Sequence, residues 1–114
     1  MHEYTLTRSV IETAVINSGG AAVTRIALAI GEASGVSGES IELYFDIVAK
    51  DTLCADAELT IERIAPKMKC GRCGELFIRK PFSFSCECGG DGAPTDIGRE
   101  FYVKYIEIAD AQHK

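Results

Sequence analysis

The chain has 114 residues, of which 46% are apolar and 25% are charged, which is the composition of one globular domain rather than of a disordered or fibrous chain. The net charge of −5 and the pI near 5.0 argue against general nucleic-acid binding, because that binding depends on phosphate neutralisation by Lys and Arg. A chain of this size buries one modest core, so any extra lobe needs another source of stability.

The first residues and the apolar runs bear on location. The N-terminus has no basic region followed by an apolar run, so a signal peptide is not expected. The longest apolar stretch, Ile26 to Ile30, is far shorter than the roughly 20 residues of a transmembrane helix. We therefore expect a cytoplasmic protein with no membrane partner. Thiols stay reduced in that compartment, so clustered cysteines predict a metal site rather than disulfides.

The first third of the chain predicts a helix followed by a strand. Residues 5–18 repeat apolar side chains near helical spacing and end at an Asn-Ser-Gly-Gly stop. Residues 23–30 alternate instead, with Ile26, Leu28 and Ile30 on one face, which is typical of a strand.

A second helix and two further strands complete the predicted elements. The helix is expected over 38–50, with Ser37 as its N-cap. Its apolar side chains recur at helical spacing and predict a buried stripe of Ile41, Tyr44, Phe45 and Val48. Alternation over 57–64 and the aromatic and β-branched residues of 101–108 predict strands.

The segment 66–98 differs from the rest of the chain. It holds all three prolines and four of the five cysteines, with little apolar material of its own. We therefore expect an α+β body formed by residues 1–65 and 99–114, with two helices and a small mixed or antiparallel sheet. The segment 66–98 is then an inserted, loop-rich, zinc-ribbon-like module between two strands of that body.

Two close cysteine pairs form the candidate metal site of this module. Cys70 and Cys73 have the C-x2-C spacing of a metal-binding knuckle, in which a tight turn aims backbone N–H groups at sulfur. Cys86 and Cys88 follow as a second pair. Four thiolates suit tetrahedral Zn²⁺, and a site closed by sulfur with no histidine nearby indicates a structural ion rather than a catalytic one. Such an ion substitutes for a missing core.

The second pair departs from the usual ribbon spacing. It is C-x-C instead of C-x2-C, which makes it harder for both sulfurs to reach one ion. Gly89 and Gly90 could relieve that strain, or Cys54 could replace one member of the pair. The apolar surroundings of Cys54 favour a buried, unreactive thiol instead.

The N-terminus offers a second ligand set. The Met1 amine, the His2 amide nitrogen and the His2 imidazole can close fused chelate rings around one ion. The Glu3 carboxylate or another nitrogen could supply a fourth ligand. A planar, nitrogen-rich set suits Ni²⁺ or Cu²⁺ rather than Zn²⁺.

Several motifs, in order along nearly the whole chain, together resemble the HypA family of hydrogenase nickel-incorporation proteins. They are the opening Met1-His2-Glu3-Tyr4 before a helix, Leu28-Ala29-Ile30-Gly31-Glu32, Ser34-Gly35-Val36, Phe45-Asp46, Leu59-Thr60-Ile61-Glu62, the cysteine pairs, Gly98-Arg99-Glu100-Phe101 and Ile106-Glu107-Ile108.

The resemblance implies a nickel metallochaperone, with Ni(II) as cargo and Zn(II) as a structural ion. It implies that His2 binds nickel with the backbone of the opening residues, that Glu3 tunes this site, and that the two cysteine pairs hold zinc. It further implies a HypB-type nickel GTPase as partner and the large subunit of nickel–iron hydrogenase as recipient, with urease maturation in some organisms. A homodimer remains open.

Two other readings of the module remain. Lys67, Lys69, Arg72, Arg79 and Lys80 form a locally basic window, as expected of a zinc-ribbon module that binds a nucleic-acid or transcription partner, although the acidic chain and the lack of interleaved aromatic residues disfavour it. The uneven cysteine pair could also serve as a redox sensor. The sequence has no P-loop, serine elbow or paired-histidine motif, so we do not expect an enzyme.

Overall fold

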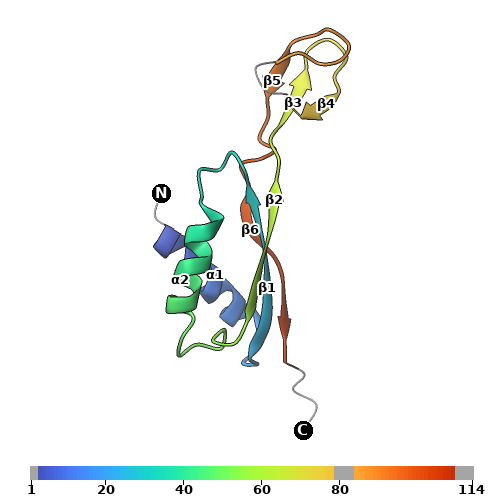
Figure 1. The fold of residues 1–114 in the computed structure, drawn as a ribbon. Coiled ribbons are helices and arrows are strands. Elements are labelled where there is room, and N and C mark those ends of the chain that lie inside the picture. The colour runs from blue at the N-terminus through green and yellow to red at the C-terminus, as the bar shows by residue number, and fades with distance from the viewer. Residues whose placement is uncertain (1–2, 79–83, 110–114) are drawn as a thin grey trace.

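The computed structural model of the protein describes residues 3–78 and 84–109. It is elongated, with principal extents of 60 × 29 × 17 Å, and Figure 1 shows two lobes joined by a narrow connection. The elements in chain order are α1 (Glu3–Asn17), β1 (Val23–Gly31), α2 (Gly38–Val48), β2 (Glu58–Ile64), β3 (Lys67–Cys70), β4 (Leu76–Ile78), β5 (Gly92–Pro94) and β6 (Phe101–Ile108).

The larger lobe is a three-stranded mixed sheet covered by the two helices, which confirms the predicted α+β fold. The strand order is β2-β1-β6, with β1 parallel to β2 and antiparallel to β6. A parallel pair needs a crossover, and α2 supplies it between β1 and β2. Both helices lie on the same side of the sheet (Figure 1), so no helix of the described residues covers its other face.

The core lies between this sheet and the helices. Ile26, Leu28 and Ile30 of β1 are all at most 2% exposed, on the face that the alternation predicted. They form one apolar cluster with side chains of the helices, including Val10, Ile11, Ala14, Ile41 and Phe45. The central strand is thus buried by both of its neighbours and by the helices.

The helix ends differ slightly from the predicted bounds. α1 begins at Glu3, two residues earlier than expected, and α2 ends at Val48. The predicted N-cap is confirmed, because the Ser40 amide donates to Ser37 Oγ at 3.2 Å. Within the predicted stripe, Tyr44 is only half-buried and packs edge-to-face on Tyr4 of α1, with the ring centroids 5.7 Å apart.

The smaller lobe contains a second antiparallel sheet of strand order β4-β3-β5. These three strands were not predicted, since the segment 66–98 was expected to be loop-rich. Each has only three or four residues, which is too short for alternation to identify a strand.

Close backbone packing joins the two lobes. The Ala33 amide of the larger lobe donates to Gly98 O at 2.7 Å. A Cβ atom on Gly31 would lie 2.0 Å from Gly98 O. A larger residue at Gly31 would therefore force the lobes apart.

Candidate metal centres

The first cysteine pair lies on a turn that follows β3. Cys70 is the last residue of that strand, and its sulfur accepts hydrogen bonds from the Arg72 amide at 3.3 Å and the Cys73 amide at 3.4 Å. This is the arrangement that the C-x2-C spacing predicted. Amide donors at sulfur favour the thiolate form, which is the form that binds metal.

The second pair lies on a tight turn closed by backbone hydrogen bonds. The Cys86 amide donates to Gly90 O at 2.8 Å, and the Gly89 amide donates to Cys86 O at 2.9 Å. Gly89 has φ +93°, a conformation that residues with a Cβ rarely adopt. A Cβ atom on Gly90 would lie 2.7 Å from Cys70 Sγ. The two glycines thus let the short C-x-C pair close against the first pair.

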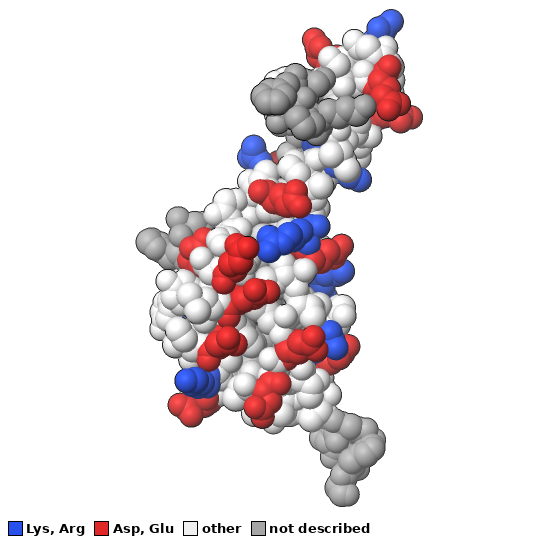
Figure 2. Space-filling view, viewed as in Figure 1, with Lys and Arg blue, Asp and Glu red and all other residues white. Residues whose placement is uncertain are grey.

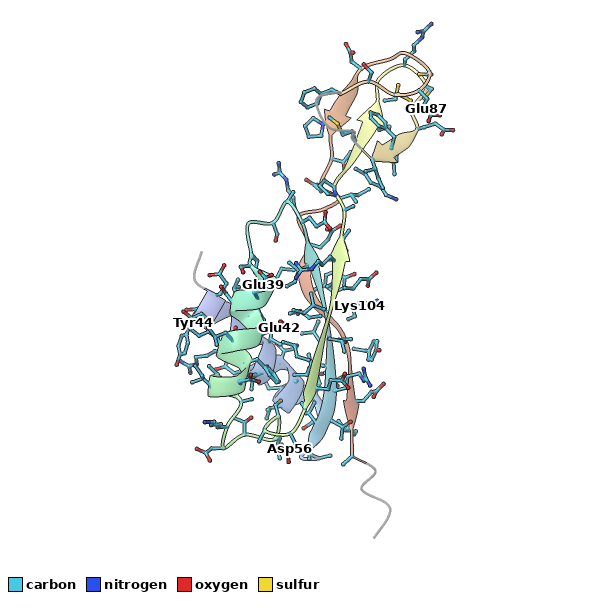
Figure 3. The ribbon with its side chains drawn as sticks, in the orientation of Figure 1. Glu39, Glu42, Tyr44, Asp56, Glu87 and Lys104 are labelled. Carbon is cyan, nitrogen blue, oxygen red and sulfur yellow. The ribbon has the colours of Figure 1, made fainter. Side chains whose placement is uncertain are left out.

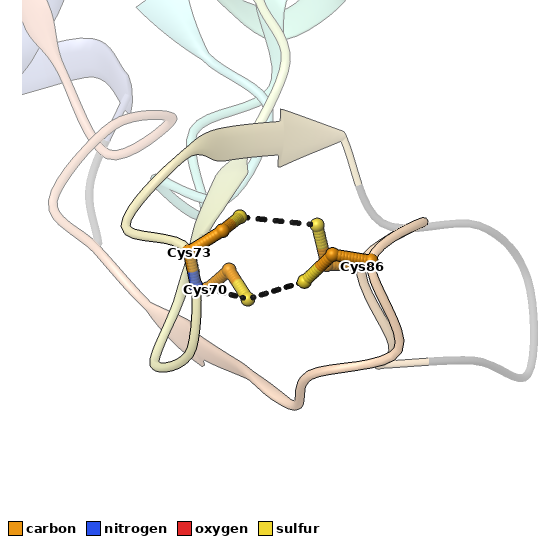
Figure 4. A group of neighbouring side chains, drawn as sticks. Cys70, Cys73 and Cys86 are labelled. Carbon is orange, nitrogen blue, oxygen red and sulfur yellow. Dashed lines mark hydrogen bonds between the residues drawn. The ribbon is translucent and has the colours of Figure 1, made fainter.

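The four thiols converge on one point. Cys70 Sγ lies 3.5 Å from Cys88 Sγ, and Cys73 Sγ lies 3.7 Å from Cys86 Sγ (Figure 4). All four sulfurs lie within 4.8 Å of one another. Zn–S bonds near 2.3 Å in a tetrahedron place the sulfurs about 3.8 Å apart. The cluster therefore fits a structural zinc site.

The thiols differ in acidity before any ion is considered. The hydrogen bond from the Cys73 amide is the largest influence on the pKa of the Cys70 thiol and lowers it. Desolvation raises this pKa, the hydrogen bond from the Arg72 amide lowers it further, and the result is a pKa of about 6. At Cys73 the Glu75 amide lowers the pKa, but desolvation and the other three thiols raise it to about 12. A closed group of thiols cannot lose all its protons unless a cation compensates the charge.

Cys54 lies apart from this cluster. It is 0% exposed and belongs to the core of the larger lobe, together with residues such as Val23 and Ala49. Burial raises the pKa of its thiol, although a hydrogen bond with Thr52 lowers it in part. The structure therefore brings together both members of the C-x-C pair and leaves Cys54 as a core residue.

The N-terminal ligand set is only partly described. Met1 and His2 lie outside the described residues, whereas Glu3 begins α1. One carboxylate oxygen of Glu3 accepts a hydrogen bond from the Ser37 amide at 3.2 Å, and the Glu3 carbonyl accepts one from the Thr7 hydroxyl at 2.7 Å. Glu3 thus ties the start of α1 to the start of α2. Sequence analysis missed Ser37 here because no local pattern links residues 34 positions apart.

The basic window is not a single free surface. Lys67 and Lys69 are exposed on β3, but Arg72 donates to Cys88 O at 3.3 Å and so braces the two cysteine turns. Arg79 and Lys80 lie outside the described residues. Within residues 3–78 and 84–109, no helix is long and apolar enough to cross a membrane.

The fold and the thiol cluster define a class: a small two-lobed protein with an α+β lobe and a lobe built around a four-cysteine metal site. The family model "Hydrogenase/urease nickel incorporation, metallochaperone, hypA" matches residues 1–108. The chain therefore belongs to the HypA family. Members of this family are metallochaperones that bind nickel, not enzymes, as the sequence predicted.

Relatives and solved structures agree over nearly the whole chain. The hydrogenase maturation factor HypA of Caldanaerobacter subterraneus subsp. tengcongensis is 36% identical over 95% of this chain and 99% of its own. That of Geobacter metallireducens is 38% identical with the same coverage. The solution structure of the Ni metallochaperone HypA from Helicobacter pylori matches with TM-score 0.60 at 26% identity, over 95% of this chain and 97% of its own. A second solution structure of a HypA protein matches with TM-score 0.67 at 25% identity, over 96% and 97%.

Proposed function

We propose that this protein binds Ni²⁺ through its first residues and delivers it to nickel–iron hydrogenase during maturation. The observation that carries this proposal is that the family match begins at residue 1 and so includes Met1, His2 and Glu3. The relatives named above are hydrogenase maturation factors, and one solved neighbour is titled a Ni metallochaperone.

The proposed nickel ligands are nitrogen atoms of the first two residues. The Met1 amine, the His2 amide and the His2 imidazole form a donor set that prefers Ni²⁺ over Zn²⁺ for its geometry. Glu3 helps to tune this site in the proposal, and one of its carboxylate oxygens accepts a hydrogen bond from the Ser37 amide. In this proposal Glu3 orients the chelating residues by fixing the turn from which they emerge.

The proposed zinc ligands are Cys70, Cys73, Cys86 and Cys88. A structural zinc would supply a fixed crosslink between the two cysteine turns, in a lobe whose described residues include only two buried apolar side chains, Met68 and Cys70. The residues 66–98 then form the zinc-binding module, and 1–65 with 99–114 form the nickel-binding body.

The proposed partners follow from the role of the family. Nickel insertion needs a donor complex and a recipient, here a HypB-type GTPase and the hydrogenase large subunit in the cytoplasm, with urease maturation as a second route. The sequence contains no P-loop motif. GTP hydrolysis is therefore the task of the partner.

Calorimetry of untagged protein tests the nickel assignment. The change His2→Ala should abolish stoichiometric Ni²⁺ binding, because it removes the imidazole and opens one chelate ring, and it should leave the zinc content and the circular dichroism unchanged. The matched control is His113→Ala, which removes the other histidine of the chain and should bind nickel as the parent does. Normal nickel stoichiometry in His2→Ala would refute the assignment.

A further inference from the structure

The four clustered cysteines of the smaller lobe differ in exposure. Cys70 is only 2% exposed, whereas Cys73 and Cys88 are exposed and Cys86 is half-buried. The three more accessible cysteines line one cavity at the surface of the lobe. A metal chelator in solution therefore reaches the cluster from this side, and Cys70 is the least accessible of the four residues.

The surroundings of the cluster are acidic. Glu75 and Glu87 line the same cavity, and the exposed Asp91 follows the second cysteine turn. Figure 3 shows Glu87 on the smaller lobe, away from the helices, and Figure 2 shows acidic side chains on the viewed face of that lobe. Four thiolates around one Zn²⁺ leave a net negative charge, to which these carboxylates add. A cation at the turns would therefore stabilise the zinc-loaded lobe.

Arg72 is a cation that contacts both cysteine turns. Its amide donates to Cys70 Sγ at 3.3 Å, and its Nη1 atom donates to Cys88 O, also at 3.3 Å. Its side chain follows the second turn, because a Cβ atom on Gly90 would lie 2.5 Å from Arg72 Cβ and one on Gly89 would lie 3.4 Å from Nη1. The guanidinium forms no ion pair with residues 3–78 and 84–109. Its charge thus remains available to the thiolates.

We propose that Arg72 is a positioning residue that slows the release of zinc from the smaller lobe, an inference that rests on the proposed zinc ligands. Each Zn–S bond that breaks during release is replaced by a bond to the chelator, and the freed thiolate takes a proton from water. Cys88 is the exposed ligand that Arg72 holds by its carbonyl. Arg72 thus keeps the sulfur of Cys88 in place and offsets the negative charge of the cluster.

The proposed function needs one metal to leave and the other to stay. Nickel is cargo, whereas loss of zinc would cost the smaller lobe the crosslink between its turns. Among the described residues of this lobe only Met68 and Cys70 are buried apolar side chains, and the second turn contains two glycines that add no side-chain contacts. Arg72 supplies the missing contacts, because its side chain spans this turn and donates to Cys88 O.

Zinc release from the full-length, zinc-loaded protein to a colorimetric chelator tests the role of Arg72. We expect release from Arg72→Gln to be at least about five-fold faster than from the parent, since the change removes a charged hydrogen bond. Arg72→Lys keeps the charge and one donor, so its rate should lie between the two. Limited iodoacetamide treatment of zinc-loaded Arg72→Gln should modify Cys88 before the other cysteines of the lobe. The absorption spectrum of each variant loaded with cobalt should still report four thiolate ligands.

The matched control is Lys69→Gln, which removes the same charge from an exposed residue of β3 next to Cys70 and should release zinc as the parent does. Equal release from Arg72→Gln and the parent would overturn the proposal. Equally fast release from Lys69→Gln and Arg72→Gln would also overturn it, because loss of any nearby positive charge would then suffice. A parent protein that binds no zinc would instead refute the zinc ligands themselves, so the two failures are distinguishable. His2→Ala should release zinc at the parent rate.

Discussion

At the scale of single residues, two glycines without side chains allow the four thiols to come together. The C-x-C pair closes because Gly89 takes a positive φ and because Gly90 carries no Cβ. At the N-terminus, the Glu3 carboxylate contacts the first residues of α2 rather than remaining free. Both details depend on residues far apart in the chain, so the sequence could suggest the ligands but not how they are held.

The change Gly90→Ala should weaken zinc binding. Its Cβ would lie 2.5 Å from Arg72 Cβ and 2.7 Å from Cys70 Sγ, so one cysteine turn must shift. We expect zinc to be lost to a colorimetric chelator at least about ten-fold faster than from the parent, since small shifts in ligand position weaken a closed site. Gly71→Ala is the matched control, because its Cβ would meet only Asp91 O at 3.7 Å. Equal release rates would contradict the packing argument.

Substitutions at Glu3 separate positioning from nickel ligation. The side chain of Gln keeps an oxygen that can accept the hydrogen bond from the Ser37 amide, whereas the side chain of Ala has no acceptor. We expect Glu3→Gln to retain most of the nickel affinity and Glu3→Ala to lose about ten-fold, with faster hydrogen exchange of the Ser37 amide only in Glu3→Ala. Equal loss in both variants, with the Ser37 amide still protected, would identify the carboxylate as a direct ligand.

Cys54 is expected to act as a core side chain. The change Cys54→Ala should cost about 1 kcal/mol in the free energy of unfolding, from urea titration, and leave one zinc bound. Because burial raises the pKa of this thiol, the fold favours its protonated form, and that contribution to stability is lost as the pH rises above 9.0. In the folded protein at lower pH, Cys54 should resist iodoacetamide. Loss of zinc in Cys54→Ala would show that it is a ligand after all.

At the scale of elements, the sequence predicted most of what long, periodic segments determine. Both helices and the strands β1, β2 and β6 appear within two residues of their predicted bounds, because each packs one apolar face on a common core. The strands of the zinc lobe were missed, since β4 and β5 have three residues each and their pairing is set by turns. The position of Cys54, buried in the core of the other lobe, was likewise not determined by its local sequence.

The two lobes should respond differently to zinc removal. The core of the larger lobe is continuous, but among the described residues of the smaller lobe only Met68 and Cys70 are buried apolar side chains. We expect a strong chelator to abolish hydrogen-exchange protection in β3, β4 and β5 while β1 keeps its protection. Restored protection on adding one equivalent of zinc is the control. Uniform loss across both lobes would show that the zinc also holds the larger fold.

At the scale of the whole molecule, we assign two metals to two lobes. In this proposal structural zinc crosslinks the end of the molecule that lacks a core, and cargo nickel binds at the N-terminus of the other lobe, beside α2. Gly31 and Gly98 join the lobes through close backbone contact. The separation keeps sulfur ligands, which suit zinc, away from the nitrogen ligands that suit nickel.

X-ray absorption at both metal edges of untagged protein, loaded with one zinc and one nickel, tests this division most directly. We predict a zinc site with four sulfur neighbours near 2.3 Å and a nickel site with only nitrogen and oxygen neighbours. The nickel signal should be lost in His2→Ala while the zinc signal is unchanged. Sulfur scattering at the nickel edge, or a zinc site with fewer than four sulfurs, would contradict the division.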